Sequence, residues 1–326
     1  MQAVPLIAGE SGYVRANTDW LAKCRYGIGV HWTAQTVPQH GDPLPFQRAV
    51  DAFKLMEFVS QVQDAGADYV LFTACHALQM LPAPHPVIDK ILPGRTCKRD
   101  LIGELADALA AHGLPLLVYY NHSCNHAQDR PWEQAVGYHA ANKDRFATNL
   151  IDIIACMGVR YGDRIKAWWF DSPYSLDPRG PHSSVTTDMT GFQFPWERFT
   201  VAAKTGFPAR PVTYNPGVAK TYLYTTHQDY WAGELVNLKT PATSRYLPNG
   251  LQWFGWTCLD FRAWVHTKRN TEIPKPLYSD EEVITYVRQC NSHQAPMTFD
   301  VGIYQDGTMA PPSVEQLRRL GAALKG

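Results

Sequence analysis

Short apolar runs alternate with helical patterns along most of the chain, and this alternation is the feature that most restricts its fold. Runs of apolar, β-branched or aromatic residues predict strands, and stretches with a 3.6-residue period predict helices. The predicted strands cover 26–32, 69–74, 115–121, 165–171, 211–215, about 225–231, 251–259 and 297–304. The predicted helices cover 53–65, 98–112, about 134–161, 195–205, 281–293 and 313–324.

This pattern of strands and helices favours an α/β fold of the (β/α)₈ TIM barrel type over an open sheet. A doubly wound sheet needs a glycine-rich phosphate-binding turn after its first strand, and the Trp-Thr-Ala-Gln sequence at 32–35 is not one. The 165–171 run is apolar almost throughout, as expected for a parallel strand buried on both faces. With no repeat or linker visible, we expect one domain over residues 1–326, without a C-terminal β-sandwich.

Charge balance and cysteine usage exclude several classes of protein. The chain has 30 Lys and Arg against 30 Asp and Glu, so no long-range field would attract a nucleic acid or an anionic membrane. Its seven scattered cysteines, without a CxxC pair, are typical of free thiols in a reducing compartment. Because neither a secretory signal nor a membrane-spanning apolar stretch is visible, we expect a cytoplasmic protein, and a homo-oligomer stays open.

Polar and aromatic side chains gather where the predicted strands end. In a barrel of this type the C-terminal ends of the strands converge on one pocket. The residues at or after these ends are His31, Trp32, Cys75, His76, Tyr119, Tyr120, Asn121, His122, Asp171, Asp229, Trp231 and Glu234. Imidazole and hydroxyl groups around carboxylates suit a sugar, and a carboxylate pair can hydrolyse a glycosidic bond. Asp171, after a Trp-Trp-Phe run, is placed to be the nucleophile.

Several of these residues also have a purely structural interpretation. Asp171 could cap the segment that follows it, and His31 and His76 could be buried core histidines. Trp231 could serve as a rim platform for a sugar or as part of the core. His122 and His126 have the spacing of a metal pair, but no third ligand is in view, so we expect no metal and no cofactor.

At these residues the sequence resembles the α-L-fucosidases of glycoside hydrolase family 29. Five segments match family motifs in the right order: 26–33, 53–80, 99–121, 169–172 and 298–321. The resemblance implies a retaining mechanism with Asp171 as nucleophile and with His31 and His76 hydrogen-bonding the sugar. It also implies that Tyr120 lines the site, and we add Trp32 and Trp231 as sugar-binding candidates.

The chain also departs from the family at positions that carry chemistry. Within 75–79 the family's second His and its Asp-Gly are absent, so one hydroxyl contact is missing or supplied by another residue. The family's Trp-Glu pair aligns with 253–254, which holds no carboxylate, and no equivalent of its sugar-site arginine is evident. The general acid/base is therefore Glu234, Glu133 or Asp229, and we favour Glu234, in a loop on the mouth side.

We therefore expect a retaining exo-glycosidase that releases a terminal α-L-fucosyl or related residue from a small glycoside. Two alternatives stay open. One is a fucosidase-like protein that binds sugar without hydrolysis, and the other is a glycosidase with a different sugar specificity.

Overall fold

The computed structural model describes residues 12–125, 127–180 and 183–325, and in these ranges the strands form one seven-stranded sheet. The strands are β1 (Tyr26–Val30), β2 (Val70–Cys75), β3 (Leu116–Asn121), β4 (Ile165–Asp171), β5 (Val212–Tyr214), β6 (Gly255–Cys258) and β7 (Met297–Asp300). Their order is β5-β4-β3-β2-β1-β7-β6, and neighbouring strands pair in parallel. Seven of the predicted strands are thereby confirmed within a few residues.

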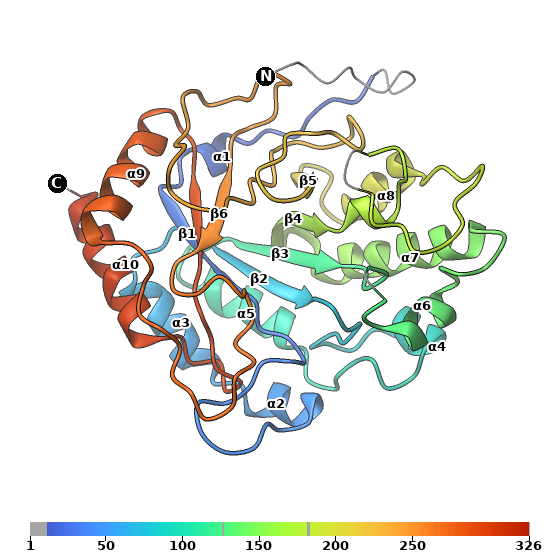
Figure 1. Ribbon diagram of the computed structural model, residues 1–326, viewed down its shortest axis with the longest axis horizontal. Helices are drawn as coiled ribbons and strands as arrows, with labels where there is room; N and C mark the ends of the chain where they lie inside the picture. Colours follow the sequence, from blue (N-terminus) through green and yellow to red (C-terminus); the bar gives the residue numbers. More distant parts are fainter. Residues whose placement is uncertain (1–11, 126, 181–182, 326) are drawn as a thin grey trace.

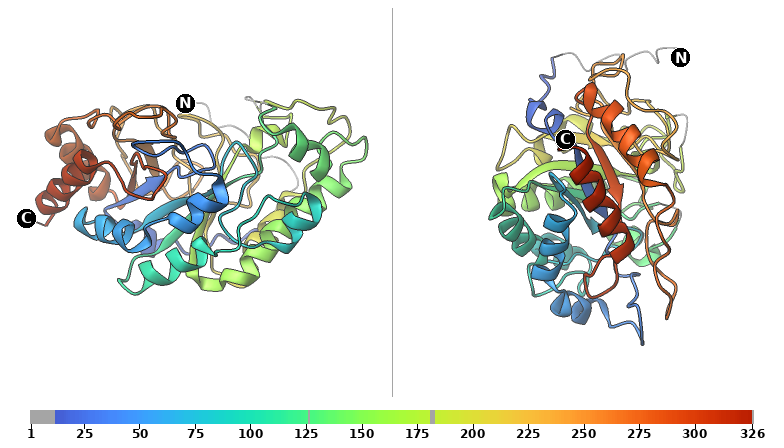
Figure 2. Two further views of the ribbon diagram at one scale, coloured as in Figure 1. Left: turned by 90° about the horizontal axis from the view of Figure 1, so that it is seen from below. Right: turned by 90° about the vertical axis from the view of Figure 1, so that its left-hand side faces the viewer.

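Helices lie at the periphery of the sheet (Figure 1). They are α1 (Asp19–Ala22), α2 (Phe46–Ala52), α3 (Leu55–Asp64), α4 (Pro86–Ile91), α5 (Leu101–Ala110), α6 (Arg130–Val136), α7 (Asp144–Tyr161), α8 (Trp196–Ala203), α9 (Asp280–Ser292) and α10 (Pro311–Ala323). Figure 2 shows α9 and α10 side by side at one edge of the molecule. Local capping fixes several helix starts: the Asp100 side chain accepts a hydrogen bond from Gly103 N at α5, and Ser279 and Glu282 form a capping box at α9.

The single helical tract predicted at about 134–161 is wrong, because the structure divides it into α6 and α7. Gly137 follows α6 with a φ of 95°, in the left-handed region where glycine commonly ends a helix. The helices predicted at 53–65, 98–112, 195–205, 281–293 and 313–324 are confirmed, with small shifts at their ends.

An irregular segment, 229–235, closes the sheet between its edge strands β5 and β6. On one side the Asp229 N–H donates to the Val212 carbonyl at 2.8 Å, and on the other the Trp256 N–H donates to the Gly233 carbonyl at 2.8 Å. The strand predicted near 225–231 is therefore present only as isolated bridges. The result is a barrel with eight positions around its wall, of which seven are regular strands.

Gly233 explains why this eighth position is irregular and why Glu234 lies where it does. Its φ is 62°, and a Cβ atom at this position would overlap the carbonyl of Phe254. Only glycine permits both the conformation and this close approach of two backbones. The residue after it, Glu234, forms a parallel bridge with Trp256 of β6.

Side chains of the strands form two apolar layers, one inside the barrel and one between the strands and the helices. Successive strand residues point to opposite faces, so alternate positions belong to alternate layers. The inner layer includes Tyr69, Leu71, Leu117, Tyr119, Ala167, Trp169, Tyr230, Ala232, Phe254 and Trp256. The outer layer includes Val30, Trp32, Phe72, Val118, Tyr120, Trp168 and Phe170. By this alternation Asn121 and Asp171, which are paired in register, end the inner faces of β3 and β4.

Large inner aromatic rings require small residues opposite them, and Gly27 of β1 is one of these. A Cβ atom on Gly27 would overlap the ring of Tyr69, whose hydroxyl is fixed by a 2.7 Å hydrogen bond with Thr298. We therefore expect Gly27→Ala to lower the free energy of unfolding by about 1–3 kcal/mol, measured by urea denaturation. In a Tyr69→Leu background the same change is expected to cost less. Equal costs in both backgrounds would contradict this account of the overlap.

Candidate active site

The carboxylate of Asp171 lies at the end of β4, partly buried, with three neutral donors around it. Its Oδ2 accepts hydrogen bonds from the Tyr119 hydroxyl at 2.6 Å and from Asn121 Nδ2 at 3.1 Å. Its Oδ1 accepts one from Asn215 Nδ2 at 2.9 Å. All three donors are side-chain groups, so the carboxylate is oriented by its neighbours without being enclosed by main-chain amides.

Asn215 joins Asp171 to a second carboxylate, that of Glu234. The same Nδ2 atom donates to Glu234 Oε2 at 2.7 Å, while Asn215 Oδ1 accepts from the Gly217 N–H at 3.1 Å and so fixes the amide orientation. Because both carboxylate oxygens are bonded to one nitrogen, at 2.9 and 2.7 Å, they lie at most 5.6 Å apart. The structure thus brings together the two residues that we predicted as the catalytic pair.

The carboxyl group of Glu234 holds a proton more tightly than an ordinary glutamate does. Burial and the nearby negative charge of Asp171 raise its pKa to about 7, against an opposing effect of the hydrogen bond from Asn215. Near neutral pH a substantial fraction of Glu234 therefore carries a proton. A pair of this kind can offer one acid and one base or nucleophile at the same time.

Two histidines stand on the inner face beside this pair. His31 Nδ1 lies 2.8 Å from Asp300 Oδ1, and its ring meets the His76 ring edge-on with 5.3 Å between centroids. Tyr119 links them to the carboxylates, since its ring is 5.1 Å from that of His31 and its hydroxyl bonds Asp171. Residues at or directly after the ends of β1, β2, β3 and β4 thus meet at one end of the barrel.

Both imidazoles are uncharged at neutral pH. Burial lowers the pKa of His31 to about 3, against an opposing effect of Asp171. Burial and the neighbouring His31 lower the pKa of His76 to about 4, again opposed by Asp171. Neutral imidazoles can donate to and accept from hydroxyl groups, and His76 Nδ1 is buried without a hydrogen-bond partner in the described ranges.

Aromatic rings complete this end of the barrel. Trp256 of β6 stacks on His31 with 5.0 Å between centroids and an interplanar angle of 22°. Trp264, in the loop after β6, contacts both of these rings, at 5.1 Å from His31 and 5.3 Å from Trp256. The cluster therefore has an apolar wall beside its polar groups.

Trp32 does not reach the cluster, contrary to our expectation. It follows His31 directly and so points to the opposite face, where it packs in the outer layer on Phe53 and Phe72. Its indole N–H donates to the Gln305 carbonyl at 3.0 Å. Trp32 is a core residue.

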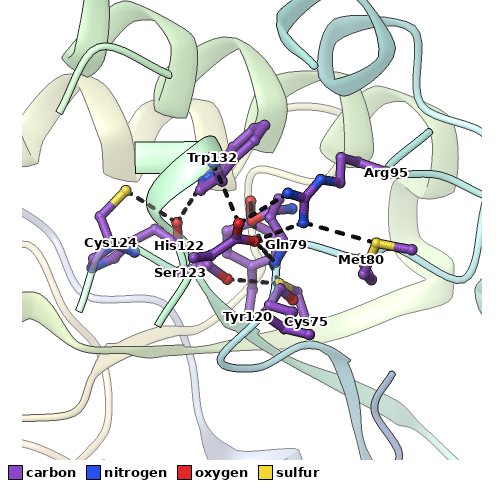
Figure 3. Close-up of polar contacts among 11 residues, drawn as sticks. Cys75, Gln79, Met80, Arg95, Tyr120, His122, Ser123, Cys124 and Trp132 are labelled. Carbon is purple, nitrogen blue, oxygen red and sulfur yellow. Dashed lines mark hydrogen bonds and ion pairs between the residues drawn. The ribbon is translucent and has the colours of Figure 1, made fainter. Parts of the chain in front are cut away.

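Tyr120 was also predicted to line the site, but its neighbour Tyr119 takes that position. Its hydroxyl donates to Gln79 Oε1 at 3.2 Å, in a polar network that also holds Cys75, Ser123 and Arg95 (Figure 3). The preceding residue, Tyr119, faces Asp171 instead. Alternation along β3 explains the difference.

Trp231 packs in the outer layer against Trp253, and its indole N–H donates to the Lys220 carbonyl at 2.7 Å. It lies on the 229–235 segment, where the inner positions are Tyr230 and Ala232. The structure therefore places it in the core and not beside the carboxylates.

The other two acid/base candidates are bonded elsewhere. Asp229 forms an ion pair with Lys204 at 3.0 Å and accepts from the Val212 N–H at 2.8 Å. Glu133 is fully buried on α6, where its Oε2 lies 2.9 Å from His139 Nε2. Of the three candidates, Glu234 is the one that shares a hydrogen-bond donor with Asp171.

His122 and His126, which have the spacing of a metal pair, were not expected to hold a metal. Both ring nitrogens of His122 are engaged, with the Ser172 carbonyl at 2.9 Å and the Cys124 N–H at 3.1 Å, and His126 lies outside the described residues. In the described ranges no three His, Cys, Asp or Glu side chains gather closely enough to hold a metal ion. The seven cysteines are free thiols. None of the helices in the described ranges is both long and apolar enough to cross a membrane.

Four residues of the cluster were not predicted as site residues: Tyr119, Asn121, Asn215 and Asp300. Tyr119, Asn121 and Asn215 end or nearly end predicted strands, so strand-end position was the available signal for them, whereas Asp300 ends β7 but lies in the middle of the predicted strand 297–304. For Tyr119 and Asn121 the alternation counted back from Asp171 would have selected the correct face.

Known proteins agree with this architecture. The alpha-L-fucosidase family model matches residues 44–326. The fold is similar to that of alpha-L-fucosidase AlfC from Lactobacillus casei in complex with alpha-L-fucose product, with a TM-score of 0.62 and 15% identity over 94% of this chain and 98% of that chain. It is also similar to the endo-fucoidan hydrolase MfFcnA9 of glycoside hydrolase family 107, with a TM-score of 0.68 and 16% identity over 94% and 64%. No curated protein matches the chain in sequence. The likenesses confirm the predicted TIM-like fold.

Proposed function

The chain belongs to the alpha-L-fucosidase family of glycoside hydrolases, and from this premise we propose that it is a retaining exo-α-L-fucosidase with Asp171 as nucleophile and Glu234 as general acid/base. One observation carries the proposal: at the end of the barrel where the strands terminate, Asn215 bridges the carboxylate of Asp171 and the carboxyl group of Glu234, whose pKa is raised to about 7. Catalytic residues of TIM barrels come from this end.

In the first step an oxygen of Asp171 attacks C1 of the bound sugar as the bond from C1 to the leaving oxygen breaks. Glu234 gives its proton to that oxygen, so the aglycone departs as a neutral alcohol and a glycosyl ester of Asp171 forms. The raised pKa of Glu234 keeps a proton available for this transfer near neutral pH. Asn215 holds both reacting groups through one amide.

In the second step Glu234, now ionised, takes a proton from a water molecule as the water oxygen attacks C1. The ester bond to Asp171 breaks, the carboxylate is restored, and the sugar leaves with its original anomeric configuration. The proximity of the carboxylates supports this route: their facing oxygens, bonded to one nitrogen, lie no more than 5.6 Å apart.

Recognition of an uncharged sugar is proposed to rest on His31, His76 and the aromatic wall. Neutral imidazoles can hydrogen-bond hydroxyl groups, and the partly buried ring of Trp264 offers an apolar face to the carbon atoms of a pyranose. The product-bound structure of AlfC supports α-L-fucose as the sugar to try first.

The decisive experiment is hydrolysis of 4-nitrophenyl α-L-fucopyranoside, followed by proton NMR of the sugar released in the first minutes. We expect release of 4-nitrophenol and α-L-fucose as the first-formed anomer. Initial β-L-fucose would contradict retention. Binding of fucose by calorimetry without any turnover would instead favour the non-hydrolytic alternative, and turnover of a different aryl glycoside alone would favour altered specificity.

Asp300 is expected to position the ring of His31, which in the proposed function contacts the sugar. Replacing Asp300 with Leu leaves the buried His31 Nδ1 without its partner, and we expect kcat/KM to fall about 10- to 100-fold, since an unsatisfied buried polar group costs about 1–3 kcal/mol. Asp300→Asn, which can still bond the ring, should lose much less. The control is His31→Phe: in that background Asp300→Leu should change kcat/KM little, and an equally large further loss would show that Asp300 acts elsewhere.

A further inference from the structure

Trp264 occupies a backbone conformation that the fold itself does not explain. Its φ is 60°, and the Val265 N–H donates across it to the Ala263 carbonyl at 2.6 Å. A hydrogen bond spanning one residue of positive φ defines a γ-turn of the rare and strained kind. For a residue as bulky as Trp this is an outlier, and such strain costs about 1–3 kcal/mol.

The strained turn presents the indole ring to the active-site cluster. The ring contacts His31 at 5.1 Å and Trp256 at 5.3 Å and is partly buried, whereas the preceding Arg262 and Ala263 are exposed. Strained residues are typical of ligand-binding sites, where the surrounding structure holds them in place.

The position of Trp264 around the barrel is opposite that of Asp171. The ring contacts residues of β1 and β6, the two strands that flank β7. With the 229–235 segment counted as the eighth position, β7 stands four positions from β4 in either direction. Asp171 ends β4, so the nucleophile and Trp264 stand on opposite sides of this end of the barrel.

We infer that Trp264 closes the sugar pocket at the end away from the nucleophile and thereby restricts the enzyme to unextended terminal fucosyl residues. With C1 held at Asp171, the C3 and C4 side of the ring faces the opposite wall, and a further sugar attached there would collide with the indole. This inference rests on the proposed function. A similar fold is found in an endo-fucoidan hydrolase, so the fold by itself does not exclude cleavage of an extended chain.

The test compares two substrates in three proteins. The substrates are 4-nitrophenyl α-L-fucopyranoside and the same compound with a β-D-galactosyl unit on O4 of its ring, a unit that an α-L-fucosidase does not remove. The proteins are the wild type, Trp264→Gly, which suits the positive φ without strain, and Trp264→Phe, which keeps a ring. The quantity measured is kcat/KM for each substrate, with the internal bond of the longer substrate monitored by release of 4-nitrophenol.

We expect the ratio of kcat/KM for the extended to the simple substrate to rise by about 100-fold in Trp264→Gly and to change little in Trp264→Phe. A merely structural role for Trp264 would lower both rates together and leave the ratio unchanged, which would overturn the inference. So would efficient cleavage of the extended substrate by the wild type. Failure of the wild type to hydrolyse the simple fucoside would instead overturn the proposed function.

Discussion

Asp171→Asn is expected to lower kcat on 4-nitrophenyl α-L-fucopyranoside by at least about 10⁴-fold, which corresponds to about 5 kcal/mol of transition-state stabilisation. The amide has nearly the shape of the carboxylate but cannot form the glycosyl ester. The surrounding donors Tyr119, Asn121 and Asn215 remain in place, so the loss should appear without loss of folding. Steady-state kinetics with thermal unfolding as a check on structure would measure it.

Azide provides a sharper test of the role of this carboxylate. In Asp171→Gly the space beside C1 is open, so added azide should attack C1, displace 4-nitrophenol and give β-L-fucosyl azide. A matched control is Asp260→Asn, because Asp260 is also buried with a pKa raised to about 7 by burial, yet it bonds Gly302 N and Ser313. That variant should lose stability and keep its chemistry. Activity of Asp171→Asn within about tenfold of wild type would contradict the nucleophile assignment.

The barrel could be predicted because its strands are nearly continuous apolar runs buried on both faces. Ile165–Asp171 was located to the residue for this reason. The face of the sheet to which each side chain points is harder to predict, and two residues were assigned to the wrong face. Trp32 and Tyr120 were chosen for standing near strand ends, yet alternation turns both outward, beside the inward-facing His31 and Tyr119.

Irregular backbone geometry also limits what the sequence can predict about the site. Plain alternation from Tyr69, Leu71 and Thr73 would turn His76 outward, but the register of β2 shifts between Thr73 and Cys75. This bulge returns His76 to the inner face, where it meets His31. A bulge adds one residue without a clear sequence signature, so the placement of His76 followed from family resemblance and not from periodicity.

Glu234, predicted as the acid/base, shares a hydrogen-bond donor with Asp171, although the strand before it was predicted as regular. Its position depends on Gly233 and on the hydrogen bonds of the closing segment to β5 and β6, which no local pattern encodes. Asn215 was missed for the opposite reason. It ends a predicted strand, as Asp171 does, but the prediction considered charged and aromatic side chains at strand ends and not this amide, which joins both carboxylates.

Glu234→Gln tests the second half of the pair, and its effect should depend on the leaving group. Loss of a general acid costs about 10²–10⁴-fold for substrates whose aglycone needs a proton to depart. A fucosyl disaccharide should therefore show a loss in this range. For 4-nitrophenyl α-L-fucopyranoside, whose phenolate leaves readily, the first step should be far less affected. Equal losses on both substrates would mean that Glu234 orients Asp171 through Asn215 and does not transfer the proton.

The pH dependence separates these roles further. Burial and the charge of Asp171 raise the pKa of Glu234 to about 7, and the protonated form is the one that donates to the leaving group. For a disaccharide substrate, kcat/KM of the wild type should therefore fall as pH rises through about 7, because the acid form is lost. Glutamine does not ionise, so the Glu234→Gln profile should stay flat across that range at its lower level. If the fall in kcat/KM at alkaline pH survives the substitution, the proton belongs to another group. If the fall disappears and the loss depends on the leaving group, the residue at 234 must both titrate near neutrality and reach the glycosidic oxygen.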